Sequence, residues 1–181
     1  WAAVEMDRRY ELFADVVARH LDDYNRKMIR KGEKPMPRIV VLIDELADLM
    51  MAMPEETERT LTRIAQMARA TGIHLVVATQ RPSTDVVTGL IKANFPARVS
   101  FATASAVDSR VILDTQGAES LLGKGDMLFL PPDISAPIRV QGCHISDEDL
   151  EAVINYWQKL RGATPAQAPW EVVAQSEGPE K

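Results

Sequence analysis

Two short aliphatic runs separated by a helix-like segment constrain the fold of this chain more than any other feature. Residues 39–43 and 73–78 are almost entirely aliphatic and rich in β-branched side chains. Such runs are typical of strands buried on both faces of a parallel sheet. Between them, Leu61, Ile64 and Ala68 recur at the spacing of one helical face. Strand, helix and strand in this order predict a right-handed crossover and an α/β layer architecture.

The remaining pattern predicts further helices and a second group of strands. The expected elements are a long one-sided helix over 1–29, a third strand over 99–103, a short helix over 107–113, and strands over 125–130 and 138–141. A Pro-Pro turn joins the last two strands, which suits a hairpin at one edge of the sheet. Ser146 and Asp149 have the spacing of a capping box, and an apolar helical face follows them. Residues 162–181 lose all periodicity, and we expect a flexible linker there.

Composition excludes several classes of protein. The 181 residues include one cysteine, Cys143, and three widely separated histidines. Neither a disulfide scaffold nor a Cys/His zinc site is therefore indicated. The longest aliphatic run, residues 39–43, is far shorter than the roughly 20 residues of a membrane-spanning helix. Because the chain begins with Trp1 and has no leader-like start, we expect it to be part of a longer protein.

The charge of the chain changes sign locally. The net charge is −5, but residues 59–110 carry seven basic side chains and only two acidic ones. An internal surface of this kind would suit a phosphate backbone, while the outer surface stays acidic. The alternative is that these are ordinary solvated charges on helix surfaces.

The strongest chemical signal follows the first strand. Asp44 and Glu45 come directly after residues 39–43, and open α/β sheets place their ligands at the carboxyl ends of the strands. In a nucleotide hydrolase, the first acid would orient hydrated Mg²⁺ and the second would polarise the attacking water. The alternative is that Asp44 caps the next helix and Glu45 favours its positive end.

The second strand ends in a matching set of polar residues. Thr79, Gln80 and Arg81 follow residues 73–78, so a parallel neighbour would bring Gln80 close to the two acids. An amide at that place can hydrogen-bond both water and a γ-phosphate. Arg81 would contact phosphate or DNA, and the alternative is a plain turn at the end of a strand.

A phosphate-binding loop of the G-x-x-x-x-G-K-[ST] type does not occur in the chain. The nearest imitation, residues 117–125, has five residues between its glycines and lacks the hydroxyl residue after Lys124. We expect a turn there. Either the fold binds no nucleotide, or the phosphate loop precedes Trp1 in a longer protein.

Several ordered segments of the chain resemble the FtsK/SpoIIIE family of bacterial DNA translocases, and the resemblance extends from Trp1 to about Leu160. The segments are EMDRRYELF, IVVLIDELADLMM, RIAQMARATGIHLVVATQRPSTDVVTGLIKANFPARVSF, SAVDSRVILD and GAESLLGKGDMLFLPP. The resemblance implies a RecA-like P-loop NTPase fold, a three-layer α/β sandwich with a mostly parallel sheet and an edge hairpin. Residues 1–161 would be the carboxyl-terminal half of the motor domain, truncated before the phosphate loop. Residues 162–181 would link it to an absent winged-helix domain.

The family's functional residues can be carried over by position. Asp44 and Glu45 match the Walker B acids, and Gln80, next to Thr79, matches the γ-phosphate sensor, which implies ATP and Mg²⁺ as cofactors. The family forms hexameric rings in which an arginine reaches the ATP of the next subunit. Arg69 is the first candidate for that arginine, and Arg8 and Arg9 are alternatives.

The resemblance also implies contacts with double-stranded DNA. The basic positions of the channel loops match Arg81, Lys92 and Arg110, whereas Ala106 stands where many relatives have lysine. The implied function is ATP-driven DNA translocation during chromosome segregation, at the cytoplasmic side of the bacterial inner membrane and at the division septum. Membrane attachment would come only from absent upstream segments, and the fragment alone would be inactive. The alternatives are a ring ATPase of conjugation or protein secretion, and a non-catalytic DNA-binding or assembly module.

Overall fold

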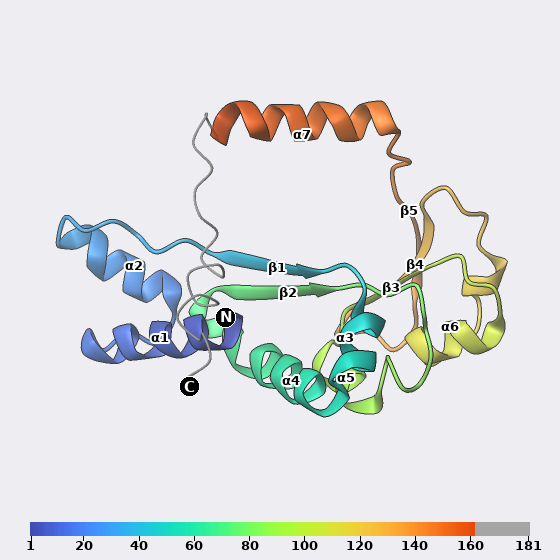
Figure 1. Ribbon diagram of the computed structural model, residues 1–181, viewed down its shortest axis with the longest axis horizontal. Coiled ribbons are helices and arrows are strands. Elements are labelled where there is room, and N and C mark those ends of the chain that lie inside the picture. Colours follow the sequence, from blue (N-terminus) through green and yellow to red (C-terminus); the bar gives the residue numbers. More distant parts are fainter. Residues whose placement is uncertain (162–181) are drawn as a thin grey trace, which may run out of the picture. The chain divides into compact units, whose positions relative to one another are not determined.

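The computed structural model describes residues 1–161, which alternate helices with short strands (Figure 1). In chain order the elements are α1 (Ala2–Asp15), α2 (Leu21–Arg30), β1 (Ile39–Ile43), α3 (Leu46–Ala52), α4 (Pro54–Thr71), β2 (Ile73–Val77), α5 (Gly89–Asn94), β3 (Arg98–Phe101), α6 (Ala106–Leu113), the 3₁₀ turn η1 (Ala118–Ser120), β4 (Asp126–Leu130), β5 (Ile138–Gln141) and α7 (Asp147–Arg161). The chain divides into two compact units. One is residues 2–141, and the other, within the described residues, is Trp1 together with residues 142–161.

The two aliphatic runs form the predicted parallel pair. β1 and β2 are aligned from Ile39 opposite Ile73 to Ile43 opposite Val77. Helix α4 lies in the crossover between them and ends at Gly72, whose φ of 75° is the left-handed conformation that glycine adopts easily. The strand, helix and strand order is therefore confirmed.

Helices cover one face of this parallel pair. α1, α3 and α4 lie on the same side of β1 and β2 (Figure 1). Two apolar clusters fill the space between them, one around Leu46 and Leu61 and the other around Met6 and Ile73. Burial of this apolar surface stabilises residues 2–141.

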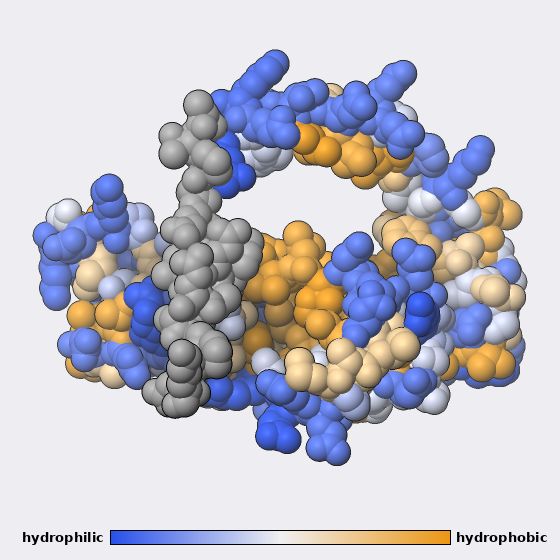
Figure 2. Space-filling model, in the orientation of Figure 1, coloured by the Kyte–Doolittle hydropathy of each residue, from blue (hydrophilic) through white to orange (hydrophobic). Residues whose placement is uncertain are grey.

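The opposite face of β1 and β2 stays apolar but exposed. Val40, Leu42 and Val76 point to this face, and their exposed fractions are 58%, 73% and 50%. Figure 2 shows hydrophobic side chains gathered over β1 and β2. Within residues 2–141, helices therefore cover one face of the parallel pair.

The predicted hairpin forms, but it belongs to a second sheet. β3, β4 and β5 make an antiparallel sheet in that order, separate from β1 and β2. α6 and η1 pack beside β3, where Leu113, Ala118 and Leu130 form a third buried cluster. β3 pairs with β4, and the pattern of residues in β3 does not reveal that partner.

The predicted long helix over residues 1–29 is two helices. α1 ends at Asp15, Val17 adopts a φ of 54°, and the His20 side chain caps α2 by accepting a hydrogen bond from the Asp23 amide at 3.2 Å. The apolar spacing in the sequence does not show this break, because residues of both helices face the same interior. Phe13 of α1 and Tyr24 of α2 pack together with ring centroids 5.1 Å apart.

Helix α7 begins with the predicted capping box. The Asp149 amide donates to the Ser146 hydroxyl, and the Ser146 amide donates to the Asp149 carboxylate. Its apolar side chains, including Val153 and Trp157, are exposed. No helix in residues 1–161 combines the length and apolarity needed to cross a bilayer. The predicted linker over 162–181 lies outside the described residues.

Candidate active site

The carboxyl ends of β1 and β2 remain tied together beyond the last paired residues. The Ala78 amide donates to the Ile43 carbonyl and the Leu46 amide donates to the Ala78 carbonyl, both at 2.8 Å. These bonds hold the segment after β1 against the segment after β2. The residues predicted from the two strand ends therefore meet at one place.

Glu45 is the most strongly bound side chain at these strand ends. Its carboxylate accepts hydrogen bonds from the Ala47 amide at 3.0 Å, from the Gln80 amide at 2.9 Å, and from the Thr79 hydroxyl. The Thr79 hydroxyl above all, and then the Gln80 and Ala47 amides, lower the pKa of Glu45 below its ordinary value. Glu45 also caps α3, so the capping alternative considered for Asp44 falls to Glu45 instead.

Asp44 differs from Glu45 in its surroundings. Its side chain is exposed and makes no hydrogen bond or ion pair with the residues that the structure describes. No cluster of three or more metal-binding side chains occurs within residues 1–161. Asp44 can therefore supply one oxygen ligand to a cation whose other ligands are water and phosphate, which is how Mg²⁺ is commonly held at phosphate-binding sites.

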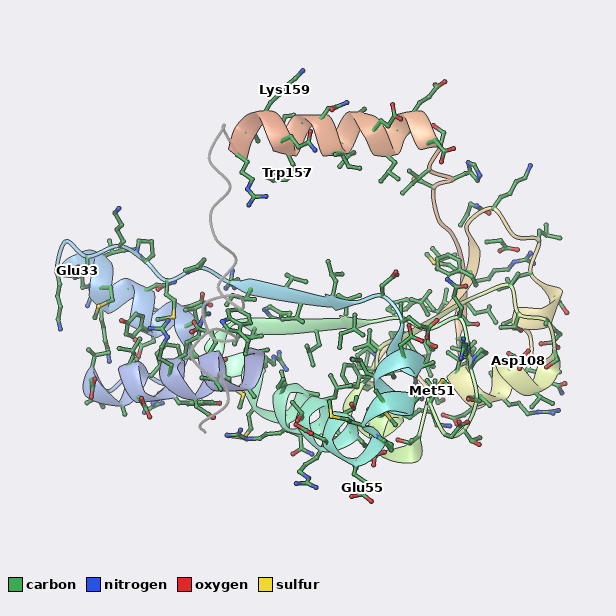
Figure 3. All side chains as sticks on the ribbon, in the orientation of Figure 1. Glu33, Met51, Glu55, Asp108, Trp157 and Lys159 are labelled. Carbon is green, nitrogen blue, oxygen red and sulfur yellow. The ribbon has the colours of Figure 1, made fainter. Side chains whose placement is uncertain are left out.

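Arg81 lies beside the same strand ends. Its amide donates to the Thr79 hydroxyl oxygen at 3.0 Å, and its guanidinium Nη1 lies 3.2 Å from the sulfur of Met51. Met51 belongs to α3 at this end of the strands (Figure 3). Thioether sulfur is a weak acceptor, so the guanidinium is available to a stronger one.

The other two predicted DNA contacts, Lys92 and Arg110, are both linked to Asp114, a residue that the sequence analysis did not single out. Asp114 Oδ1 lies 2.5 Å from Lys92 Nζ, and Asp114 Oδ2 lies 2.7 Å from Arg98 Nη1. The Asp114 amide donates to the Arg110 carbonyl at 2.9 Å, which places Arg110 one helical turn away. The Arg110 side chain is exposed and has no partner among the described residues. Asp114 thus connects Lys92 with the last turn of the helix that carries Arg110, whereas no hydrogen bond joins Arg81 to these residues within 1–161.

Arg69 lies at the opposite end of the parallel strands. It lines an open pocket of about 590 Å³ together with Arg38, before β1, and His74, near the start of β2. Its exposed guanidinium has no hydrogen bond or ion pair within the described part of the chain. Five-residue strands span roughly 16 Å, so Arg69 is too distant to act on Glu45 of its own chain.

The two alternative arginines are already engaged. Arg9 is 1% exposed, and its guanidinium donates to the carbonyls of Pro37 at 2.9 Å and Thr71 at 2.8 Å, and to Glu5. Arg8 pairs with the same glutamate at 2.7 Å. Arg9 therefore has a structural role, tying α1 to the segments that flank the two parallel strands.

The glycine-rich imitation of a phosphate loop forms a turn, as predicted. Gly123, Lys124 and Gly125 all have positive φ, and β4 starts directly after them. The Lys124 carbonyl accepts a hydrogen bond from the Gln141 side chain at 3.0 Å. The segment precedes a strand rather than a helix, so it has no helix N-terminus with which to hold phosphate.

Comparison with known proteins relates the chain to bacterial DNA translocases. The model of the FtsK/SpoIIIE family matches residues 1–84. The DNA translocase FtsK of Caldanaerobacter subterraneus subsp. tengcongensis is 60% identical over 156 residues, covering 86% of this chain and 22% of that protein. The DNA translocase FtsK of Clostridium tetani is 57% identical over 157 residues, covering 86% of this chain and 21% of its own length. The chain thus spans about a fifth of the length of these curated relatives.

Two solved structures share the fold. The conjugation coupling protein TcpA of pCW3, in its monomer form with ATPγS, superposes with a TM-score of 0.70 at 30% identity, over 86% of this chain and 46% of that one. The cytoplasmic domain of the Type VII secretion ATPase EccC of Thermomonospora curvata gives a TM-score of 0.74 at 26% identity, over 91% and 19%. The α/β fold is therefore that of the RecA-like P-loop ATPases.

The match of the amino-terminal half to the family model, the identity to FtsK proteins over most of the chain and the shared fold all agree: this chain belongs to the FtsK/SpoIIIE family.

Proposed function

We propose that this chain is the Walker B half of the motor domain of an ATP-driven DNA translocase. The observation that carries the proposal is the meeting of Glu45 with Thr79 and Gln80 at the carboxyl ends of two parallel strands, next to an unpaired Asp44. This is the edge at which open α/β sheets bind their ligands.

Each residue at these strand ends has a proposed task in ATP hydrolysis. Asp44 would hold the Mg²⁺ that accompanies the nucleotide, and Glu45 orients the attacking water and accepts its proton. The side-chain carboxamide of Gln80 contacts the γ-phosphate, and Thr79, the residue before it, helps to position Gln80. The bound cation would neutralise charge on the transferred phosphoryl group. The phosphate loop is supplied by another part of the protein, so residues 1–181 alone do not turn over ATP.

The active unit is a hexameric ring in which Arg69 completes the ATP site of the next subunit. The guanidinium of Arg69 is exposed and unpaired in an open pocket, at the end of the strands remote from Glu45. An arginine so placed can serve a neighbouring copy but not its own site. Neutralising charge on the phosphoryl group in this way accelerates hydrolysis by about 10³ to 10⁵ in GTPases that receive such an arginine.

Double-stranded DNA is the proposed cargo, contacted by Arg81, Lys92 and Arg110. Phosphate contacts give affinity without reading sequence, which a motor that crosses arbitrary DNA requires. The full protein would act in chromosome segregation at the division septum, on the cytoplasmic side of the inner membrane, with membrane attachment through other segments.

A ring ATPase of conjugation or protein secretion is the second candidate. Its support is the likeness to TcpA at 30% identity and to EccC at 26%. The higher identity to proteins named DNA translocase FtsK, 60% and 57%, favours the first candidate. Exposed cations such as Arg81 and Arg110 also favour DNA, because a polypeptide cargo gives no reason for them.

The test is DNA-stimulated ATP hydrolysis by the full-length protein carrying Glu45→Gln. We expect turnover to fall roughly hundredfold, because the amide cannot accept the proton of the attacking water. Glu55→Gln, on the exposed side of α4 (Figure 3), is the matched control and should retain wild-type turnover. Unchanged turnover in Glu45→Gln would contradict the catalytic role and favour a non-catalytic module.

A further inference from the structure

The Thr79 hydroxyl connects the proposed catalytic base with a proposed DNA contact. It donates a hydrogen bond to Glu45 Oε1 and accepts one from the Arg81 amide at 3.0 Å. A hydroxyl can donate once and accept as well, so one side chain serves both neighbours. Thr79 is thus the single residue between the proposed base and the loop that would meet DNA, with a hydrogen bond on each side.

Glu45 is held by its own chain in this arrangement. Oε1 takes both the Thr79 hydroxyl and the Ala47 amide, and Oε2 takes the Gln80 amide at 2.9 Å. An ionised carboxylate has about four acceptor positions, and three are used here. Hydrogen bonds to a charged group are among the stronger ones in proteins, so Glu45 is restrained and its oxygens are largely unavailable to water.

Arg81 is, in contrast, loosely held at its charged end. The only acceptor of its guanidinium within the described residues is the Met51 sulfur, at 3.2 Å. A DNA phosphate would replace this weak contact with a charge-assisted one. Because the Arg81 backbone amide is bonded to the Thr79 hydroxyl, a backbone shift of Arg81 toward a phosphate would strain the bond that holds Glu45.

We propose that Thr79 is a positioning residue that keeps Glu45 turned toward the end of β2 until Arg81 binds a DNA phosphate. Release of the Thr79 hydroxyl then frees Oε1 of Glu45 for the attacking water. The inference rests on the proposed function, and it makes ATP hydrolysis depend on DNA through residues 45, 79 and 81.

The experiment measures ATP turnover by the full-length protein, with and without duplex DNA, for Thr79→Val and Thr79→Ser. Valine keeps the shape and removes the hydroxyl. We expect turnover without DNA to rise at least about threefold and the stimulation by DNA to fall toward one. Serine retains the hydroxyl and should restore both the low basal rate and the stimulation.

Thr88→Val is the matched control. The Thr88 hydroxyl also donates to a glutamate, Glu58, and caps α5, but it lies away from Glu45. This variant should lose thermal stability while its stimulation by DNA stays at the wild-type ratio. Comparison of Thr79→Val with Thr88→Val therefore distinguishes the general effect of losing a Thr–Glu hydrogen bond from the specific effect of releasing Glu45.

The inference is overturned if Thr79→Val keeps the wild-type stimulation ratio, either with both rates unchanged or with both rates reduced by the same factor. Either would mean that Thr79 has only a structural role. Failure of the proposed function is recognised separately, because Glu45→Gln would then keep wild-type turnover whatever Thr79 variants do.

Discussion

At the scale of single residues, the buried charged side chains Arg9 and Asp126 are each satisfied by several hydrogen bonds. Arg9 satisfies two carbonyls and a glutamate, and Asp126, which is 5% exposed, accepts two hydrogen bonds from the Arg139 guanidinium at 2.9 and 2.6 Å. The Leu122 amide adds a third bond to Asp126 at 2.8 Å. Such pairs make the fold sensitive to loss of either partner.

The Asp126 carboxylate predicts how stability depends on acid. The Arg139 guanidinium, and then the Leu122 amide, lower the pKa of Asp126 to about 2. This pKa lies below the unfolded value of about 3.9. The ionised Asp126 carboxylate therefore contributes fully to the free energy of unfolding above about pH 4, and this contribution is lost as the pH falls toward 2. Thermal melts of wild type and Asp126→Asn should therefore differ at pH 6 and converge near pH 2.

Asp22→Asn is the control for that series. Asp22 pairs with Arg38 at 2.7 Å, but both side chains are more than half exposed. Exposed pairs contribute little, so this variant should follow the wild-type acid profile. If Asp126→Asn did the same, the pair with Arg139 would have no effect on stability.

At the scale of elements, Asp114 links α5, β3 and α6. It follows α6 in a left-handed conformation, with φ of 61°, and pairs with Lys92 of α5 and Arg98 of β3. Lys92 and then Arg98 lower the pKa of Asp114. The carboxylate neutralises the ammonium of Lys92, which is one of the proposed DNA contacts.

Removal of this internal anion should strengthen binding to DNA. In the full-length protein, Asp114→Asn leaves Lys92 and Arg98 uncompensated, and we expect DNA affinity to rise roughly two- to fivefold. The slope of log affinity against log salt should steepen by up to about 0.9 for each added phosphate contact. Fluorescence anisotropy with duplex DNA over a salt series measures both.

Asp133→Asn is the control, because it removes one negative charge from an exposed turn without freeing Lys92. It shows how much of any change in DNA affinity comes from the net charge alone. It should leave the salt slope unchanged. An Asp114→Asn slope equal to wild type would mean that Lys92 and Arg98 do not contact phosphate.

At the scale of the whole chain, the exposed face of β1 and β2 is the most consequential surface. Val40, Leu42 and Val76 form a contiguous apolar strip across two paired strands. Contiguous apolar patches of this kind drive association or aggregation when they are left uncovered. The isolated 181-residue chain should therefore self-associate in solution.

Leu42→Glu places a charge in the middle of that strip and should shift the isolated chain toward monomer, measured by light scattering coupled to size exclusion. Leu122→Glu is the control, since Leu122 is 84% exposed but lies outside the strip, before β4. Equal behaviour of both variants would show that the strip does not drive association.

The sequence by itself predicted the features that depend on neighbours along the chain. The aliphatic runs defined β1 and β2, Gly72 ended α4, and Ser146 with Asp149 capped α7. Each of these signals is complete within a few residues, as a hydrophobic period, a left-handed glycine or a reciprocal cap. The sequence also predicted that Glu45 and Gln80 lie at the same edge of the sheet, because the carboxyl ends of neighbouring parallel strands lie side by side.

Tertiary structure alone decided which distant groups pair. β3 joined β4 in a separate sheet, α1 and α2 separated at Val17, and Asp114 paired with Lys92 and Arg98. It also decided that the Thr79 hydroxyl holds Glu45, across 34 residues of sequence. These outcomes depend on packing between elements far apart in the chain, and a local pattern contains no information about which of several charged or strand-forming partners will be nearest in space.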